Sequence, residues 1–132
     1  MSTERVIVQR GASEKLISLI KQTISTIKAG NYADYPKVQL SALFSTASAE
    51  NVIGMIREAQ AEGAEVLVGD VKNEGAVVQP HVITCVKPGM RLWERESFGP
   101  SKSVNTPNPE CPNLTFFPYL KSRNRGRRRH RR

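Results

Sequence analysis

The amino-acid sequence predicts an α/β domain that is followed by a basic tail. A β-branched run near the N-terminus and an apolar run at residues 65–68 are typical of short buried strands. Between them, apolar residues recur three or four positions apart, which is the spacing of one helix face. Strand and helix patterns that alternate along one chain favour a sheet covered by helices.

The first predicted elements are a strand and a long helix. The β-branched run at residues 5–9 predicts a buried strand. A helix is predicted over residues 13–29, with Ser13 as a helix-capping residue type and Gly30 in the position of a C-cap glycine. Its apolar face consists of Ile17, Ile20, Ile24 and Ile27. Residues 30–47 show neither period and are expected to be irregular.

A second helix and two extended segments come next. The helix is predicted over residues 48–62 and ends before Gly63; its apolar stripe consists of Val52, Met55, Ile56 and Ala59. The strand at 65–68 is followed by a polar turn and an apolar segment over 76–86. Pro80 interrupts that segment, and a central sheet position is not expected at a residue without a backbone N–H.

The character of the chain changes after Pro100. No apolar period is visible there, and four prolines fall close together: Pro107, Pro109, Pro112 and Pro118. Residues 123–132 are rich in arginine, a composition that is expected to be disordered. The sequence therefore predicts part of a domain over residues 1–100 and a disordered tail over residues 101–132, first Pro-rich and then Arg-rich.

The net charge belongs to this tail. The chain has 132 residues with 20 Lys and Arg against 12 Asp and Glu, a formal charge of +8. Residues 1–100 hold eleven basic and eleven acidic side chains, whereas the last 32 residues hold nine basic ones and only Glu110. The predicted domain is thus electroneutral.

Composition also limits where the protein is expected to act. No window approaches the roughly 18 consecutive apolar residues that a membrane span requires, so no membrane partner is expected. The N-terminus shows no basic region before an apolar run, and hence no secretory signal. Two cysteines are too few for a disulfide framework or a Cys-rich zinc site. A cytoplasmic location is expected.

A family resemblance begins at residues 94–100, Glu-Arg-Glu-Ser-Phe-Gly-Pro. This run resembles the Glu-x-Phe-Gly-Pro motif of the NAD(P)-dependent aldehyde dehydrogenases. Other segments resemble the family in the same order: Arg-Val-Ile-Val at 5–8, Glu-Gly-Ala-Glu-Val-Leu-Val-Gly-Asp at 62–70, Gln-Pro-His-Val-Ile at 79–83 with His81 in place of the usual Thr, and Lys-Pro-Gly-Met at 87–90. The resemblance covers about residues 1–100 and implies part of the catalytic domain.

The resemblance implies a cofactor contact. In the family, the Glu and the Phe of the motif touch the nicotinamide riboside of NAD or NADP, and these residues correspond to Glu96 and Phe98. Without the resemblance, Glu96 would be taken for a solvated turn carboxylate and Phe98 for a core aromatic. The implied reaction is the oxidation of an aldehyde to a carboxylic acid. The match is closest in character to the vanillin and salicylaldehyde type.

The family's other catalytic groups fall outside this sequence. The nucleophilic cysteine would lie about five residues ahead of Arg5, just before Met1, and the general base and the cofactor domain would lie further N-terminal. Cys85 sits in an apolar run and is expected to be a buried, inert thiol, and Cys111 has no base beside it. The chain is therefore expected to be truncated and inactive alone, with no bound cofactor, and its status as an enzyme stays open.

Two alternatives involve a partner. The arginines of the tail could bind nucleic acid non-specifically, although no aromatic residue is interleaved among them for base stacking. A pseudoenzyme could instead dock on an intact dehydrogenase subunit through an exposed edge of an incomplete sheet.

Overall fold

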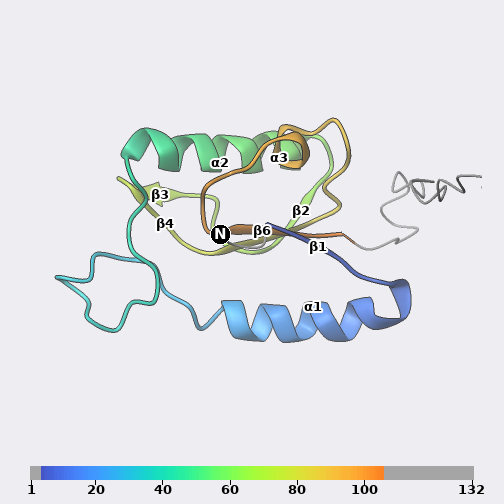
Figure 1. The fold of residues 1–132 in the computed structure, drawn as a ribbon, viewed down its shortest axis with the longest axis horizontal. Coiled ribbons are helices and arrows are strands. Elements are labelled where there is room, and N and C mark those ends of the chain that lie inside the picture. Colours follow the sequence, from blue (N-terminus) through green and yellow to red (C-terminus); the bar gives the residue numbers. More distant parts are fainter. Residues whose placement is uncertain (1–3, 106–132) are drawn as a thin grey trace, which may run out of the picture.

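A four-stranded sheet forms the centre of the computed structural model, which describes residues 4–105 (Figure 1). The strand order is β1 (Arg5–Ile7), β6 (Ser101–Asn105), β5 (His81–Thr84) and β2 (Glu65–Val68). β1, β6 and β5 run parallel, and β2 pairs with β5 in the antiparallel direction. Parallel strands need helical connections across the sheet faces, which explains why helices lie on both sides.

Helix α1 (Arg10–Ile24) covers one face of the sheet, and α2 (Thr46–Ala61) and α3 (Arg91–Glu94) cover the other (Figure 1). Neighbouring strand residues point to opposite faces, so Val82 packs in the cluster with α1 and Ile83 in the cluster with α2. A small hairpin of β3 (Asn73–Glu74) and β4 (Val77–Val78) lies beside the sheet. The predicted α/β class is confirmed.

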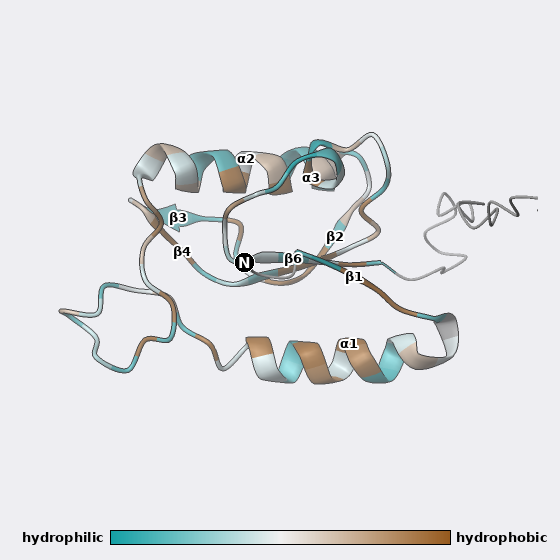
Figure 2. Ribbon diagram, in the orientation of Figure 1, coloured by the Kyte–Doolittle hydropathy of each residue, from teal (hydrophilic) through white to brown (hydrophobic). Residues whose placement is uncertain are grey.

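The helices shift relative to their predicted bounds. Helix α1 begins three residues before the predicted start at Ser13, with Gln9 as its N-cap, and ends five residues before Ala29. Figure 2 shows apolar and hydrophilic segments alternating along it. Gly30 is not a C-cap, because its N–H donates to the carbonyl of Leu40 inside the following loop. Helix α2 begins after Ser45, whose hydroxyl accepts from the Ser48 N–H.

One prediction about the strands needs correction, and the expectation for Pro80 is confirmed. β1 is an edge strand in the described sheet rather than a buried one, and Ile7 on it is 80% exposed. Pro80 itself lies outside the strands, but β5 begins directly after it and takes a central position between β6 and β2. Proline is compatible with this arrangement because it precedes the first paired residue.

The assignment of residues 101–105 to the tail is wrong, because they form the inner strand β6. The sequence Ser-Lys-Ser-Val-Asn contains one apolar residue and so shows no strand pattern. Its serines are nevertheless buried, and hydrogen bonds satisfy their hydroxyls: Ser101 bonds to Ser97 and Ser103 to the Glu4 carbonyl. The predictions for residues 106–132, including the tail and Cys111, lie outside the described residues.

Asn105 at the end of β6 predicts a stabilising substitution. Its side chain is 1% exposed, and neither amide atom has a hydrogen-bond partner within the described part of the chain. Leucine has nearly the same shape and no polar atoms, so Asn105→Leu is expected to raise the free energy of unfolding by about 1–3 kcal/mol. Urea denaturation measures the change.

The matched control for this prediction is Asn73→Leu. The Asn73 amide donates to the Gly75 carbonyl at 2.9 Å, so this variant loses a satisfied hydrogen bond and is expected to be less stable. A destabilised Asn105→Leu protein would show that the Asn105 amide makes favourable interactions.

No helix within residues 4–105 combines the length and the apolar character that membrane crossing needs.

Candidate functional site

The motif loop, residues 95–100, connects α3 to β6 and packs against α2. Gly99 allows this contact, since a Cβ at that position would lie 2.7 Å from Cγ2 of Val52. At the end of the loop, the Pro100 carbonyl accepts from the His81 N–H at 2.8 Å. The loop is therefore held by a core helix on one side and a central strand on the other.

Both predicted cofactor residues are exposed on this loop. Phe98 is 82% exposed and has a φ of +52°, a left-handed backbone that residues other than glycine rarely adopt. Glu96 is also exposed. The alternative that Phe98 is a core aromatic is therefore wrong, because the turn directs its side chain away from the buried clusters.

A largely apolar cavity of about 410 Å³ lies beside Phe98. Its walls come from the motif loop, from the starts of β5 and β6, from the end of α1 and from residues 40–43 before α2. The lining residues include Ile24, Ile27, Leu40, Leu43, Phe98 and Lys102. The exposed aromatic ring thus borders a space large enough for a small organic group.

A cluster of polar side chains lies beneath the motif loop. The Glu4 carboxylate accepts from the backbone N–H groups of Ser97 and Phe98 at 3.2 Å and from the Ser97 hydroxyl at 3.1 Å. Ser97 in turn hydrogen-bonds Ser101 at 2.8 Å. Sequence reasoning missed this cluster, because a glutamate before a strand and a serine inside the motif give no periodic signal.

Arg5 contacts Trp93 on α3, just before the motif loop. Its guanidinium donates to the Trp93 carbonyl and lies 5.0 Å from the centre of the Trp93 ring, a cation–π arrangement. Glu4 and Arg5 together attach the start of β1 to residues 93–98. A cavity of about 10 Å³, close to the size of one water molecule, remains between Glu4, Arg5 and the buried serines.

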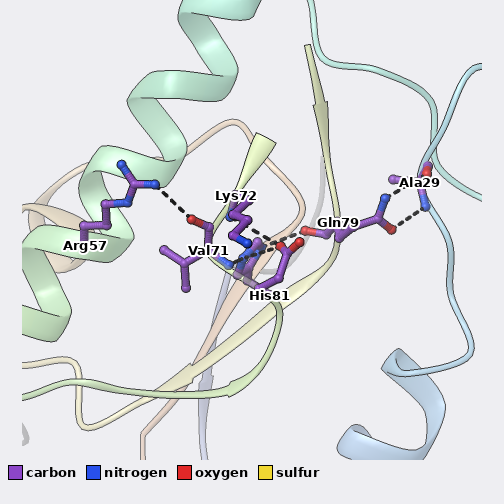
Figure 3. Close-up of polar contacts among 7 residues, drawn as sticks. Ala29, Arg57, Val71, Lys72, Gln79 and His81 are labelled. Atoms are coloured by element: carbon purple, nitrogen blue, oxygen red, sulfur yellow. Dashed lines mark hydrogen bonds and ion pairs between the residues drawn. The ribbon is translucent and has the colours of Figure 1, made fainter. Parts of the chain in front are cut away.

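A second polar network centres on His81 (Figure 3). Its Nδ1–H donates to the Gln79 carbonyl at 2.7 Å, and Nε2 accepts from the Val71 N–H at 3.0 Å. Because an N–H donates to Nε2, that nitrogen carries no proton and the ring is neutral. The Gln79 side chain continues the network by bonding both the N–H and the carbonyl of Ala29.

This network predicts a pH dependence of stability. Burial lowers the pKa of His81 below its ordinary value of 6.5, and the Gln79 carbonyl and the Asp70 carboxylate oppose that shift. The unfolded chain therefore binds the proton more readily than the folded one. His81 contributes stability that is complete above pH 6.5 and is lost as the pH falls through 6.5 towards the lowered pKa.

Urea unfolding of the chain between pH 7.5 and pH 5.5 (about one pH unit to either side of the ordinary histidine pKa) tests this dependence. The free energy of unfolding is expected to fall with pH in the native sequence and to fall less in His81→Asn. Equal slopes in the two proteins would show that His81 does not cause the effect.

The remaining candidate residues do not join the motif loop. Cys85 is 7% exposed and follows β5, so the predicted burial is confirmed, but its sulfur is disulfide-bonded and the predicted free thiol is wrong. Glu94 lies at the end of α3, where its carboxylate accepts from the Gly89 N–H at 3.0 Å. Within residues 4–105, no group of three His, Cys, Asp or Glu side chains comes together.

Comparisons of sequence match this chain to aldehyde dehydrogenases. The model of the Aldehyde dehydrogenase family matches residues 1–109. The vanillin dehydrogenase of Pseudomonas fluorescens is 34% identical over 100 residues, which are 76% of this chain and 20% of that protein. A betaine aldehyde dehydrogenase of Cereibacter sphaeroides is 36% identical over 102 residues, again 76% of this chain and 21% of the relative. The chain thus spans about a fifth of the length of these relatives.

Solved structures give the same relationship. The NADP-dependent glyceraldehyde-3-phosphate dehydrogenase of Bacillus halodurans, complexed with NADP, superimposes with a TM-score of 0.71 at 27% identity, over 78% of this chain and 21% of that one. The betaine aldehyde dehydrogenase of Staphylococcus aureus, in complex with NAD⁺, gives a TM-score of 0.69 at 28% identity, over 78% and 22%. The sequence motif, the fold and the family match agree, and the chain belongs to the aldehyde dehydrogenase family.

Proposed function

We propose that this chain carries the cofactor-contacting loop of an oxidoreductase that oxidises an aldehyde with NAD or NADP. Glu96 and Phe98 are the residues that contact the nicotinamide riboside. The observation that carries the proposal is the exposure of both side chains on a loop whose backbone is tied to α2, β5 and Glu4.

The residue types suit the two halves of this ligand. A carboxylate at Glu96 accepts hydrogen bonds from ribose hydroxyls, and an aromatic face at Phe98 packs against a planar ring. Gly99 and Pro100 direct both residues by fixing the turn between α3 and β6. A rigid turn lowers the entropic cost of ordering these side chains when the cofactor binds.

The substrate class that we propose is an aromatic aldehyde. The vanillin dehydrogenase relative supports this choice, as does the vanillin and salicylaldehyde character of the motif segments. The proposed location is the cytoplasm.

We further propose that these 132 residues do not oxidise aldehydes alone. The family reaction needs a cysteine thiolate as nucleophile. The sequence contains two cysteines, Cys85 and Cys111. Cys85 is buried and its sulfur is disulfide-bonded, so it offers no thiolate. We accordingly propose that these residues carry the cofactor-contacting loop without catalysing the reaction alone.

An activity assay on the purified chain tests this part. Vanillin and betaine aldehyde are incubated with the chain and with NAD or NADP, and NAD(P)H absorbance is followed. The expected result is no turnover above a protein-free control. Turnover that disappears in Cys85→Ser or Cys111→Ser would overturn the proposed inactivity.

A second candidate function is that of a pseudoenzyme bound to an intact dehydrogenase subunit. The exposed edge strand β1, with Ile7 80% exposed, supports this candidate, because unpaired edges accept further strands. Co-expression with an intact relative and size-exclusion chromatography test it, and Ile7→Lys is expected to abolish co-elution. Co-elution that Ile7→Lys leaves unchanged would exclude the β1 edge.

Non-specific nucleic-acid binding by the arginines of residues 123–132 stays a prediction from the sequence. If the prediction holds, nucleic-acid binding by the chain weakens steeply as the salt concentration rises and disappears when residues 121–132 are deleted. Binding that survives the deletion would exclude the tail as its source.

A further inference from the structure

We propose that Glu4 is a positioning residue that sets the conformation of the motif loop. Its carboxylate holds the backbone of Ser97 and Phe98 and so determines how Phe98 and Glu96 are presented. The expected effect on cofactor binding rests on the proposed function. The effect of Glu4 on the loop conformation does not depend on it.

The carboxylate of Glu4 has several donors on the loop and none of them is charged. Oε1 accepts from the N–H groups of Ser97 and Phe98 at 3.2 Å each and from the Ser97 hydroxyl at 3.1 Å. Oε2 also accepts from the Ser97 N–H at 3.2 Å. Hydrogen bonds to a charged acceptor are stronger than neutral ones, so this small set of contacts has a large effect on two consecutive peptide groups.

The main chain of Glu4 is itself fixed. Its carbonyl accepts from the Ser103 N–H at 2.8 Å and from the Ser103 hydroxyl at 3.3 Å. The next residue, Arg5, pairs with Ser103 in the sheet. The carboxylate therefore extends from a rigid edge of the sheet, which allows it to impose a geometry on the loop.

The loop needs such a constraint at Phe98. A φ of +52° is unfavourable for an aromatic residue and persists only where surrounding contacts determine it. The Phe98 N–H points to Glu4 in this conformation, while the side chain is exposed. Without the acceptor, the residue is expected to relax to an extended backbone, which would redirect the phenyl ring.

The buried side chain of Ser97 extends the effect of Glu4 to the rest of the motif loop. Ser97 is 4% exposed and shares its hydroxyl between Glu4 and Ser101. Gly99 donates its N–H to the same Ser97 oxygen at 3.3 Å. The hydroxyl of Ser97 thus joins the carboxylate to the next turn of the loop, and Glu4 acts on residues 97–99 as one unit.

NMR on the full 132-residue chain tests this role. Two readouts are measured: the amide hydrogen-exchange protection of Ser97 and Phe98, and the three-bond coupling between the Phe98 amide proton and Hα, which reports φ. The variants are Glu4→Ala, which removes the acceptor, and Glu4→Gln, which keeps one acceptor oxygen. The control is Glu74→Ala, which removes an exposed carboxylate from β3.

The expected result is a loss of protection at Ser97 and Phe98 of at least about tenfold in Glu4→Ala, with a smaller loss in Glu4→Gln. The Phe98 coupling is expected to move to its extended value in Glu4→Ala. Protection of the Ile83 amide in β5 reports whether each variant is folded, and Glu4→Gln supplies the comparison if Glu4→Ala does not fold. Unchanged protection and coupling at Phe98 in a folded variant would overturn the proposal.

A separate experiment tests whether Glu4 affects cofactor binding. Glu4→Gln is also introduced into an intact relative that carries residues 4–105 of this chain, and KM for NAD or NADP is compared with kcat. We expect KM to rise more than kcat falls, because the loop binds rather than reacts. A loosened loop with an unchanged KM would refute the proposed function and leave the positioning of the loop intact.

Discussion

Replacing Gly69 by alanine is expected to lower the free energy of unfolding by about 3 kcal/mol. Gly69 follows β2 with a φ of +113°, a conformation that alanine adopts only under strain. A Cβ there would also lie 2.7 Å from both Cγ and Nε2 of the His81 ring. Backbone strain and steric overlap therefore act at the same position.

The His81 ring has little freedom to avoid this overlap. The Gln79 carbonyl and the Val71 N–H bond its two nitrogens, and its side chain is buried. Movement of the ring would break at least one of these hydrogen bonds and would disturb Val71, which also accepts from Arg57 (Figure 3). Gly69→Ala is thus expected to weaken the contact between α2 and the β2–β3 turn as well.

Urea unfolding compares Gly69→Ala with Gly75→Ala. Gly75 also has a positive φ, of +56°, but nothing lies within 4 Å of a Cβ at that position. The control is therefore expected to show the cost of strain without the overlap, about 1 kcal/mol. Equal losses in the two variants would show that the His81 ring moves freely.

Replacing Gly99 by alanine is expected to lower the free energy of unfolding by about 1–3 kcal/mol and to shift the motif loop away from α2. The added Cβ would lie 2.7 Å and 2.9 Å from the two γ-carbons of Val52. Val52 is fully buried in the main core cluster, so neither side can give way without repacking.

The matched control for Gly99→Ala is Gly54→Ala on α2 itself. A Cβ at Gly54 meets nothing within 4 Å, and alanine favours the helix, so this variant is expected to be as stable as the native chain or more so. The double variant Gly99→Ala with Val52→Ala isolates the overlap: its loss is expected to be smaller than the sum of the two single losses. Additive losses in the free energy of unfolding would mean that a Cβ at position 99 does not overlap with Val52.

The main elements of the fold could be predicted because their residues show a period. The isoleucines at 17, 20 and 24 identify α1, and the stripe around Val52 identifies α2. β6 could not be found this way, because its buried serines are satisfied by hydrogen bonds to Ser97 and to the Glu4 carbonyl and give no apolar period. The end of α1 was missed for a similar reason: Ser25 and Thr26 turn their hydroxyls back to the carbonyls of Gln22 and Thr23, beyond which the helix does not continue.

Part of the candidate site could likewise be predicted from the sequence, and part could not. Glu96 and Phe98 were predicted from a motif, and the structure shows that both residues are exposed. Glu4 was not found, because it is 93 residues from Ser97 in the sequence and only the pairing of β1 with β6 brings them together. Contacts that depend on strand order are not visible in local patterns.

The cofactor role of the motif loop can be measured directly in a chimera. Residues 4–105 of this chain replace the matching segment of the Pseudomonas fluorescens vanillin dehydrogenase, and kcat/KM for the cofactor is determined for Glu96→Gln and Phe98→Ala. Glu94→Gln is the control, since glutamine keeps the oxygen that accepts from Gly89. We predict a loss of about 10- to 100-fold for Glu96→Gln and Phe98→Ala and about twofold or less for Glu94→Gln. Losses equal to that of Glu94→Gln in an active chimera would contradict the assignment of Glu96 and Phe98 to the cofactor.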